Sequence, residues 1–268
     1  MNHEDVGRLW EGNAETWTAL ARAGYDVYRD ALNTPAFFAM LPEVGGLEGL
    51  DIGCGEGHNT RLVARRGARV IGIDISNTFV RHASEEEARE PLGIEYVQGS
   101  GLELPFAAGR FDFATAFMSL MDMPEPGRVL AETWRVLRPG GFLQFSILHP
   151  CFMTPHHRNL RGADRRTYAF EVGDYFRRTN GEVESWIFST TPETERQRYP
   201  KFQVPRFTRP LGEWINLLVA AGFAIERVEE PRPDDETVAR VPEVQDAQVV
   251  AYFLHVRVRK PAGARRES

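Results

Sequence analysis

The chain has 268 residues, enough for one domain with insertions and a sizeable buried core. Its 32 Lys and Arg residues against 38 Asp and Glu residues give a formal net charge of −6. A mildly acidic chain has no general attraction for phosphate backbones, so nucleic acid is not expected as a partner. We expect a small molecule instead.

The N-terminus lacks the basic segment and apolar run of a signal peptide, and no apolar stretch approaches the ~18–20 residues that span a bilayer. Cys54 and Cys151 lie far apart and indicate no disulfide framework. These features predict a cytoplasmic protein with no membrane partner. A monomer and a homodimer both remain open.

Residues 1–45 are expected to form a helical N-terminal segment. Four apolar residues recur on one face of a predicted helix over 4–23, namely Trp10, Ala14, Trp17 and Ala21. A second short helix is expected over 34–41. Because the first helix precedes the first strand and its apolar face is narrow, we predict a lid with Trp17 toward the ligand. Ordinary packing of the tryptophans is the alternative.

Residues 46–148 alternate between short apolar strands and helical segments. Strands are expected over 46–53 (with a turn), 68–74, 94–99, 110–117 and 142–148, and helices over 59–67, 76–90 and 126–141. This alternation indicates an α/β fold with a doubly wound, mostly parallel, seven-stranded Rossmann-like sheet.

Residues 149–210 interrupt the alternation with many aromatic residues and no clear period. A structureless loop of this length is uncommon in a compact domain, so we predict an inserted substrate cap with a strand near 184–190. Residues 211–268 complete the core. They are expected to supply a helix (211–223), an edge strand (224–230), a polar loop (231–246), a long antiparallel strand (247–258) and a frayed tail (260–268).

The most informative motif is LDIGCGEG at 50–57, between the first strand and the first helix, where parallel sheets bind ligands. Glycines at 53, 55 and 57 let the backbone turn tightly and approach a ligand closely. Asp74 ends the second strand, where a carboxylate can accept hydrogen bonds from both ribose hydroxyls of a nucleotide-like cofactor.

Two cofactor classes share this architecture, and a glycine-rich turn alone can also be only a turn. The nicotinamide fingerprint is G-x-G-x-x-G, whereas Gly57 follows Gly55 after one residue. Asp51, immediately before the glycines, would repel a pyrophosphate but suits the cationic sulfonium and ammonium of S-adenosylmethionine (SAM). The charge argument favours SAM.

Four motifs, in this order, resemble those of the class I SAM-dependent methyltransferases: LDIGCGEG, IGIDIS, FDFATAFMSLMDM and RVLRPGGFL. The resemblance is strong over 47–148 and weaker over 211–258. It implies SAM as cofactor and S-adenosyl-L-homocysteine as product. Besides Trp17 of the predicted lid, the residues expected to bind the cofactor are Asp51, Gly53, Cys54, Gly55, Asp74, Ile75, Ser100, Gly101, Phe117 and Met118.

Each part of the cofactor has an expected partner in this resemblance. Asp51 and the glycines line the methionine part, Asp74 holds the ribose, and Ile75 packs on the adenine. The family often has an acid after its third strand, in a Gly-Asp-Ala-like turn, but this chain has Ser100 there. Its hydroxyl can accept the adenine hydrogen bond only without charge assistance.

The predicted catalytic base is His149, which directly follows the fifth strand and so lies at the cofactor edge of the sheet. A structural loop histidine is the alternative. Related small-molecule methyltransferases often have a histidine in an HRTL-like segment after the insertion, but 208–211 reads Thr-Arg-Pro-Leu. No metal is expected, because the spacing of His149, Cys151, His156 and His157 matches no zinc pattern.

The sequence therefore predicts a SAM-dependent methyltransferase that acts on a small aromatic or apolar molecule at oxygen, nitrogen or activated carbon. The aromatic insertion favours a flat or apolar acceptor, unless those rings form only the insertion's own core. A nicotinamide-dependent oxidoreductase and a catalytically silent SAM-binding regulator are the alternatives.

Overall fold

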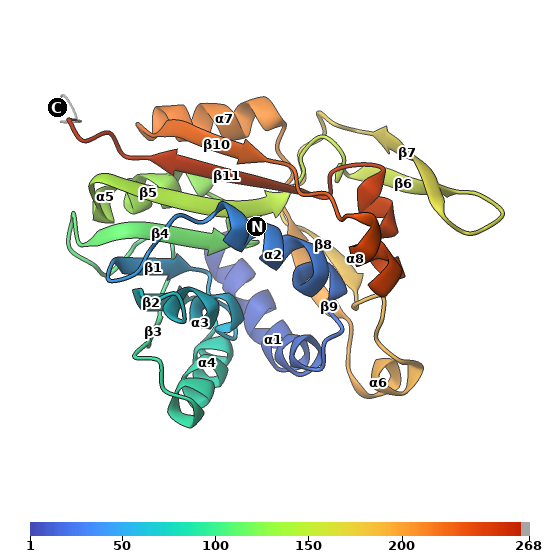
Figure 1. Ribbon diagram of the computed structural model, residues 1–268, viewed down its shortest axis with the longest axis horizontal. Coiled ribbons are helices and arrows are strands. Elements are labelled where there is room, and N and C mark those ends of the chain that lie inside the picture. Colours follow the sequence, from blue (N-terminus) through green and yellow to red (C-terminus); the bar gives the residue numbers. More distant parts are fainter. Residues whose placement is uncertain (264–268) are drawn as a thin grey trace.

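A mostly parallel sheet organises the computed structural model, which describes residues 1–263. In this part of the chain, seven strands run in the order β10-β11-β5-β4-β1-β2-β3 (Figure 1). The strands of the sheet are β1 (Glu48–Ile52), β2 (Arg69–Asp74), β3 (Glu95–Gln98), β4 (Phe111–Phe117), β5 (Leu137–Leu148), β10 (Ala224–Glu229) and β11 (Phe253–Arg259).

The pairing confirms the predicted Rossmann-like fold with an antiparallel edge hairpin. Strands β1 to β5 pair in parallel, and the strand order reverses between β1 and β4. Strand β11 is antiparallel to both β5 and β10, so β10 forms the edge. Ligands of such sheets bind at the carboxyl ends of the strands near the reversal point.

Helices cover both faces of the sheet. The helices of residues 1–263, including α6 and α8 away from the sheet, are α1 (His3–Arg22), α2 (Thr34–Met40), α3 (His58–Ala64), α4 (Asn77–Arg89), α5 (Pro126–Val136), α6 (Glu193–Arg198), α7 (Leu211–Ala220) and α8 (Asp235–Arg240). Shorter helical turns are η1 (Arg29–Asn33), η2 (Leu120–Asp122) and η3 (Pro242–Gln248). Trp214 of α7 packs with Phe145 on one face, and Phe37 of α2 joins Phe113 in the cluster on the other. Because successive side chains of a strand point to opposite faces of the sheet, the sheet has one hydrophobic core on each face.

The helix expected over 4–23 is present as α1 and begins with a capping box. The Asn2 side chain accepts a hydrogen bond from the Asp5 N–H, and the Asp5 side chain accepts one from the Asn2 N–H. Two backbone donors that would otherwise be unsatisfied are thereby paired. Helix α1 packs against α4 on one side and against the insertion on the other.

The insertion over 149–210 contains two hairpins and a short helix. One hairpin joins β6 (His156–Arg161) to β7 (Thr167–Gly173), and the other joins β8 (Glu182–Trp186) to β9 (Phe202–Arg206). In Figure 1 these elements lie beyond the arrowheads of β4 and β5. The insertion therefore lies at the ligand-binding end of the sheet.

The structure differs from the predicted elements at the end of α5 and in the polar loop. Helix α5 ends at Val136 rather than 141, because Pro139 and Gly140 break the helix and Leu137 already pairs with Phe111. The polar loop expected over 231–246 contains α8 and η3, and Asp234 caps α8 by accepting the Thr237 N–H.

The end of the chain also differs from the prediction. The last strand begins at Phe253 rather than 247, because η3 occupies Pro242–Gln248. Lys260, assigned to a frayed tail, is buried and donates to the carbonyls of Trp134 and Leu137. The rest of that tail, residues 264–268, lies outside the described residues.

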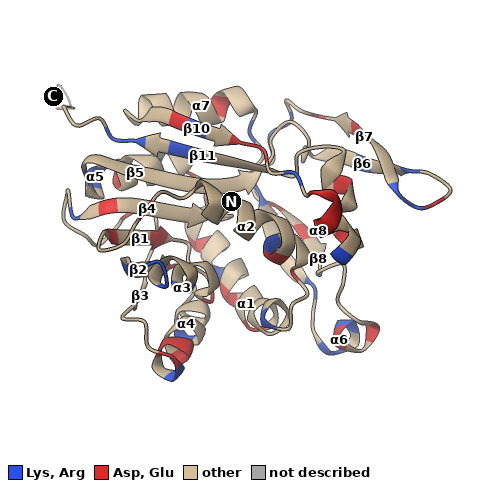
Figure 2. Cartoon of the chain, viewed as in Figure 1, with Lys and Arg blue, Asp and Glu red and all other residues tan. Residues whose placement is uncertain are grey.

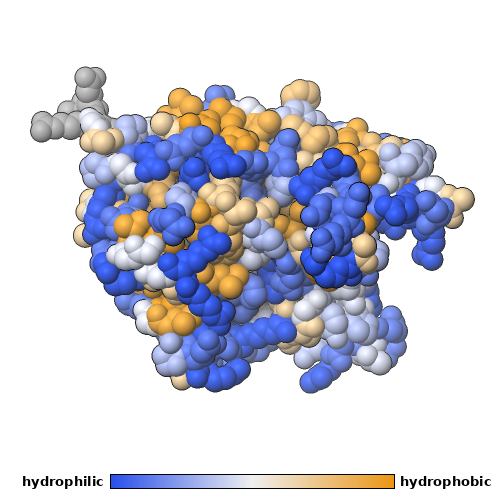
Figure 3. Space-filling model, viewed as in Figure 1, coloured by the Kyte–Doolittle hydropathy of each residue, from blue (hydrophilic) through white to orange (hydrophobic). Residues whose placement is uncertain are grey.

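The surface is mixed in charge and polarity. Figure 2 shows acidic and basic residues interspersed, for example on α6. Figure 3 shows apolar atoms near α7 and β10, where Val219 and Val228 are exposed. Within residues 1–263, no helix is both long and apolar enough to cross a membrane.

Candidate functional site

A cavity of about 730 Å³ lies at the carboxyl ends of β1 to β5. Its wall includes Gly53 after β1, Asp74 at the end of β2, and Phe117 at the end of β4. Small-molecule sites have volumes of about 300–1,000 Å³, so this cavity has the size and the place of a ligand site.

The glycine-rich turn uses Gly53 and Gly55 for different reasons. Both residues have positive φ, +72° and +55° respectively. A Cβ on Gly53 would lie 2.8 Å from Ser119 Oγ, so packing within the protein requires glycine there. A Cβ on Gly55 would have no described protein atom within 4 Å. Gly55 lines the cavity, and the open space beside it lets a ligand approach the backbone closely.

Asp74 lies at the edge of this turn and is held in place by the backbone. Gly55 N–H donates to its Oδ2 and Ser76 N–H donates to its Oδ1, each at 2.9 Å. Burial raises the pKa of Asp74 to about 6, although these amide donors lower it. Each carboxylate oxygen keeps a further lone pair, which suits the two hydroxyls of a ribose.

Asp51 is not part of the cavity wall, in contrast to the predicted contact with the methionine part of SAM. It is fully buried behind the turn, where Thr60 and Thr115 donate to its two oxygens at 2.6 and 2.8 Å. Its carboxylate thus joins β1, α3 and β4. Burial raises its pKa, while the two threonine hydroxyls lower it. Its predicted attraction for a cationic cofactor stays a prediction.

The other predicted cofactor residues line the same cavity: Trp17, Cys54, Ile75, Ser100, Gly101, Phe117 and Met118. Met118 adopts a left-handed conformation with φ of 54°, which is uncommon outside glycine and occurs at functional sites. Ser100 Oγ accepts the Leu102 N–H, so its hydroxyl proton remains to be donated. This end of the cavity, with its open glycine backbone and the Asp74 carboxylate, suits a nucleoside-containing cofactor.

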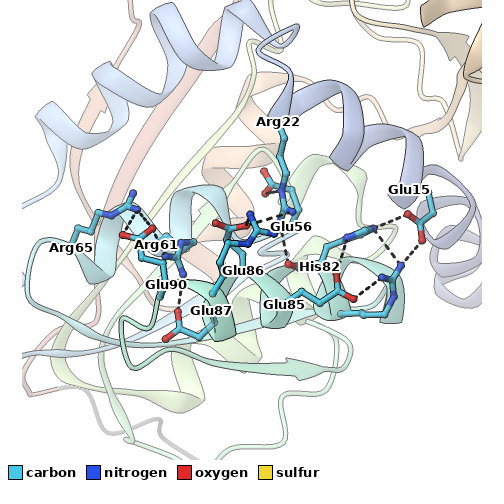
Figure 4. A network of polar contacts seen from close by, with 12 residues as sticks. Glu15, Arg22, Glu56, Arg61, Arg65, His82, Glu85, Glu86, Glu87 and Glu90 are labelled. Carbon is cyan, nitrogen blue, oxygen red and sulfur yellow. Dashed lines mark hydrogen bonds and ion pairs between the residues drawn. The ribbon is translucent and has the colours of Figure 1, made fainter.

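Ion pairs attach the N-terminal segment to the glycine-rich turn. Glu56 in the turn pairs with Arg22 of α1 at 3.3 Å and with Arg29 of η1 at 3.4 Å. Figure 4 shows Arg22 between Glu56 and Glu86 of α4, with Glu15 of α1 bonded to His82 nearby. These contacts place α1 along one side of the cavity.

An aromatic cluster joins α1 to the insertion. Trp17 lies at its centre, with ring centroids 5.7, 5.0 and 4.8 Å from those of Trp186, Phe188 and Phe202. Asn13 of α1 also exchanges two hydrogen bonds with the backbone of Gln203, at 2.9 and 2.8 Å. The rings of Trp17, Trp186 and Phe188 form an apolar wall of the cavity.

His149 lies outside the cavity wall and is only 2% exposed. Its Nδ1 accepts the Cys151 N–H at 3.1 Å, and its Nε2 lies 2.7 Å from Glu230 Oε1. Burial lowers the pKa of His149, although Glu230 raises it. With Nδ1 accepting and Nε2–H donating, no lone pair is free to take a proton from a substrate. The base role stays a prediction, and this geometry favours a structural one.

A group of charged residues on the same cavity is not predicted from the sequence. They are Asp122 of η2, Glu184 of β8 and Arg206 of β9. Asp122 carried one local signal, because it is an acid between two methionines near the end of the FDFATAFMSLMDM motif. Glu184 and Arg206 had no such signal, since only the pairing of β8 with β9 brings them to the cavity.

Comparison with known proteins places the chain among SAM-dependent methyltransferases. A family model described as a methyltransferase domain matches residues 50–145. A SAM-dependent methyltransferase from Mesorhizobium loti, solved as a crystal structure, is 30% identical with a TM-score of 0.67. That similarity covers 84% of this chain and 96% of that one.

Two curated relatives match over shorter stretches. A malonyl-[acyl-carrier protein] O-methyltransferase of Pectobacterium atrosepticum is 30% identical over 46% of this chain and 48% of its own length. A ubiquinone biosynthesis O-methyltransferase of Methylococcus capsulatus is 35% identical over 42% of this chain and 48% of its own. The chain thus spans about half the length of these curated relatives.

Proposed function

Because the chain belongs to the SAM-dependent methyltransferases, we propose that it transfers the methyl group of SAM to a small, largely apolar molecule. The acceptor binds in the same cavity as the cofactor. In such an in-line displacement the main work of the protein is to align the acceptor with the methyl group and to exclude water.

One observation carries this proposal: a single cavity has two chemically different ends. Gly55, Asp74 and Ser100 line one end, and they suit the amino-acid, ribose and adenine parts of SAM. Met153, Trp186 and Val204 come from the insertion and line the other. An apolar wall with few polar groups is typical of a site for a flat or apolar ligand.

The N-terminal segment (1–45) and the insertion (149–210) act in this proposal as a joint cover over the core formed by 46–148 and 211–268. Trp17 of the first segment contacts Trp186 and Phe188 of the second. Covers of this kind keep water from the reacting atoms. The two curated relatives are named as O-methyltransferases, which supports an oxygen atom as the methyl acceptor.

Titration calorimetry and isotope transfer test the proposal. We expect S-adenosylhomocysteine to bind and NAD to give no heat. Labelled SAM, mixed with the protein and extracts of its source organism, should label a small molecule seen by mass spectrometry. The matched variant Asp74→Asn should weaken both the binding of S-adenosylhomocysteine and the transfer of label. Binding of NAD in place of the SAM product would favour the oxidoreductase alternative. Binding without any transfer would favour a silent SAM-binding regulator.

A further inference from the structure

Asp122 lies where the cofactor end of the cavity meets the insertion. Its neighbours Ser119 and Met123 pack against the glycine-rich turn, because a Cβ on Gly53 would lie 2.8 Å from Ser119 Oγ and 3.6 Å from Met123 Cε. From this position Asp122 faces Arg206 and Glu184 of the β8–β9 hairpin, whose charges act on its carboxyl group. It therefore adjoins both the expected cofactor and the expected acceptor.

The carboxyl group of Asp122 is buried without a hydrogen-bonding partner. The residue is 8% exposed, and no donor in residues 1–263 lies within hydrogen-bonding distance of its side chain. The nearby Arg206 is engaged elsewhere, with Glu184 at 3.4 Å and the Met153 carbonyl at 3.0 Å. A buried carboxyl group without a partner is costly, so its presence on a cavity wall indicates a ligand.

We propose that Asp122 is the catalytic base, and that the acceptor is a small molecule with an acidic hydroxyl, of the phenol or enol class. This inference rests on the proposed function. A carboxylate acceptor would be repelled by Glu184 and by the ionised form of Asp122, and a neutral amine needs no proton removed before it attacks. A weakly acidic hydroxyl both fits between these charges and gains from a base.

The step is balanced in atoms and electrons. The acceptor oxygen forms a C–O bond to the methyl carbon as its O–H proton passes to the Asp122 carboxylate. The C–S bond of the sulfonium breaks, and its electron pair stays on sulfur. Arg206, fixed by Glu184 and the Met153 carbonyl, provides a positive charge near the carboxylate before the proton arrives.

Two further features support this role. Burial raises the pKa of Asp122 to about 8, although Arg206 lowers it and Glu184 raises it, and a base works best with a pKa near the working pH. Asp122 and Arg206 also line a side cavity of about 40 Å³, together with Thr208 and Tyr175. A space of this size with several polar side chains on its wall can hold water, which gives the proton a route away from Asp122.

The ionisable groups around this position come from several elements. Arg206 and Glu184 face Asp122 from the β8–β9 hairpin. His157 lines the main cavity, and Tyr175 and Arg209 line the side cavity. His157 is the competing base, because its Nδ1 is paired with the Thr154 carbonyl at 2.7 Å and its Nε2 keeps a lone pair.

The test compares the wild type with Asp122→Asn, His157→Gln and the exposed control Asp174→Asn. Each protein receives labelled SAM with a panel of phenols, catechols and enolic diketones, and with carboxylic acids and primary amines as comparison classes. We expect label on hydroxyl compounds. Asp122→Asn should lower kcat about a hundredfold or more, while KM and S-adenosylhomocysteine affinity stay within a few-fold. The wild-type rate should rise with pH through about 8, and that rise should vanish in Asp122→Asn.

Other outcomes overturn the inference and leave the proposed function standing. These are transfer only to carboxylates or amines, a normal rate in Asp122→Asn, or the whole loss appearing in His157→Gln. If no compound is labelled, titration of 4-nitrophenol into the protein loaded with S-adenosylhomocysteine decides by its absorbance. Absence of binding rejects the acceptor class, and binding with equal ionisation in wild type and Asp122→Asn rejects the base. Failure of S-adenosylhomocysteine itself to bind would reject the proposed function instead.

Discussion

Gly53 and Gly55 belong to one motif, but a different physical requirement favours glycine at each position. Gly53 is enclosed by the protein's own atoms, whereas Gly55 borders open cavity. The sequence pattern predicts both glycines alike, because spacing carries no information about which neighbour each backbone atom meets.

Alanine at these two positions should therefore have separate effects. Gly53→Ala should lower the free energy of unfolding by about 2–5 kcal/mol, because a positive φ and overpacking against Ser119 add together. Gly55→Ala should cost only about 1–2 kcal/mol, from the positive φ, but should weaken S-adenosylhomocysteine binding more than tenfold. Chemical denaturation and calorimetry measure the two effects. Equal loss of stability in both variants would contradict the distinction.

Asp74 should give cofactor binding a pH dependence. Only the ionised carboxylate accepts hydrogen bonds from both ribose hydroxyls, and the pKa of Asp74 is raised by burial to about 6. SAM affinity should thus fall as the pH drops through about 6. Asp74→Asn should weaken binding by about 1.5–3 kcal/mol at pH 8 and flatten this dependence. An unchanged affinity in the folded variant would remove Asp74 from the cofactor site.

His149→Ala separates the base and structural roles of this histidine. Because the buried His149 ring makes two hydrogen bonds, its removal should lower the free energy of unfolding by about 2–4 kcal/mol. The rate per folded molecule should stay within a few-fold of the wild type. A hundredfold loss of rate at unchanged stability would instead support the base role.

At the scale of elements, α1 is held on two sides by contacts of different strength. Toward α4, the exposed Glu15 pairs with Arg81 and His82. Toward β9, Asn13 exchanges two part-buried hydrogen bonds with Gln203 beside the Trp17 cluster. Exposed ion pairs contribute about 0–1 kcal/mol, so the Glu15 pairs should contribute less than the part-buried bonds of Asn13.

Hydrogen exchange of the variants Asn13→Ala and Glu15→Gln tests which of these two contacts contributes more to holding α1. Asn13→Ala should speed exchange in α1 and β9 together, because each loses its bond to the other. Glu15→Gln should change exchange little. In the wild type, S-adenosylhomocysteine should slow exchange over 10–30, as expected of a cover. Equal exchange with and without the ligand would assign the tryptophans to ordinary packing.

The sequence predicts best those elements whose formation depends on residues within the element itself. Strand alternation indicates β1 to β5, and Ser76 marks the start of α4 by accepting the Phe79 N–H. Helix α8 was missed because its six residues carry almost no periodic signal. The residues at the cofactor end of the cavity can be predicted because they lie in one continuous region of motifs. Asp122 and Arg206 are far apart in the sequence, and only the fold of the insertion brings them together.

At the scale of the whole molecule, the sheet and the cover have separate hydrophobic cores. The sheet cores contain residues from β1 to β5 and from the helices on both faces. The cover core contains Leu20 and Ala21 of α1 with Phe188, Phe202 and Val204 of the insertion. The predicted cofactor residues other than Trp17 thus lie within 46–148, whereas the cover contributes Met153, Trp186 and Val204 to the cavity wall.

The shared core of α1 and the insertion has a consequence for synthesis on the ribosome. Leu20 is made early, but its partners Phe202 and Val204 follow about 180 residues later. At about 5–20 residues per second, the apolar face of α1 waits on the order of 10–40 s for its partners. During that interval the nascent chain presents tryptophans to solvent, a target for chaperones and a source of aggregation. A ribosome that stalls before residue 202 leaves this helix without its partners.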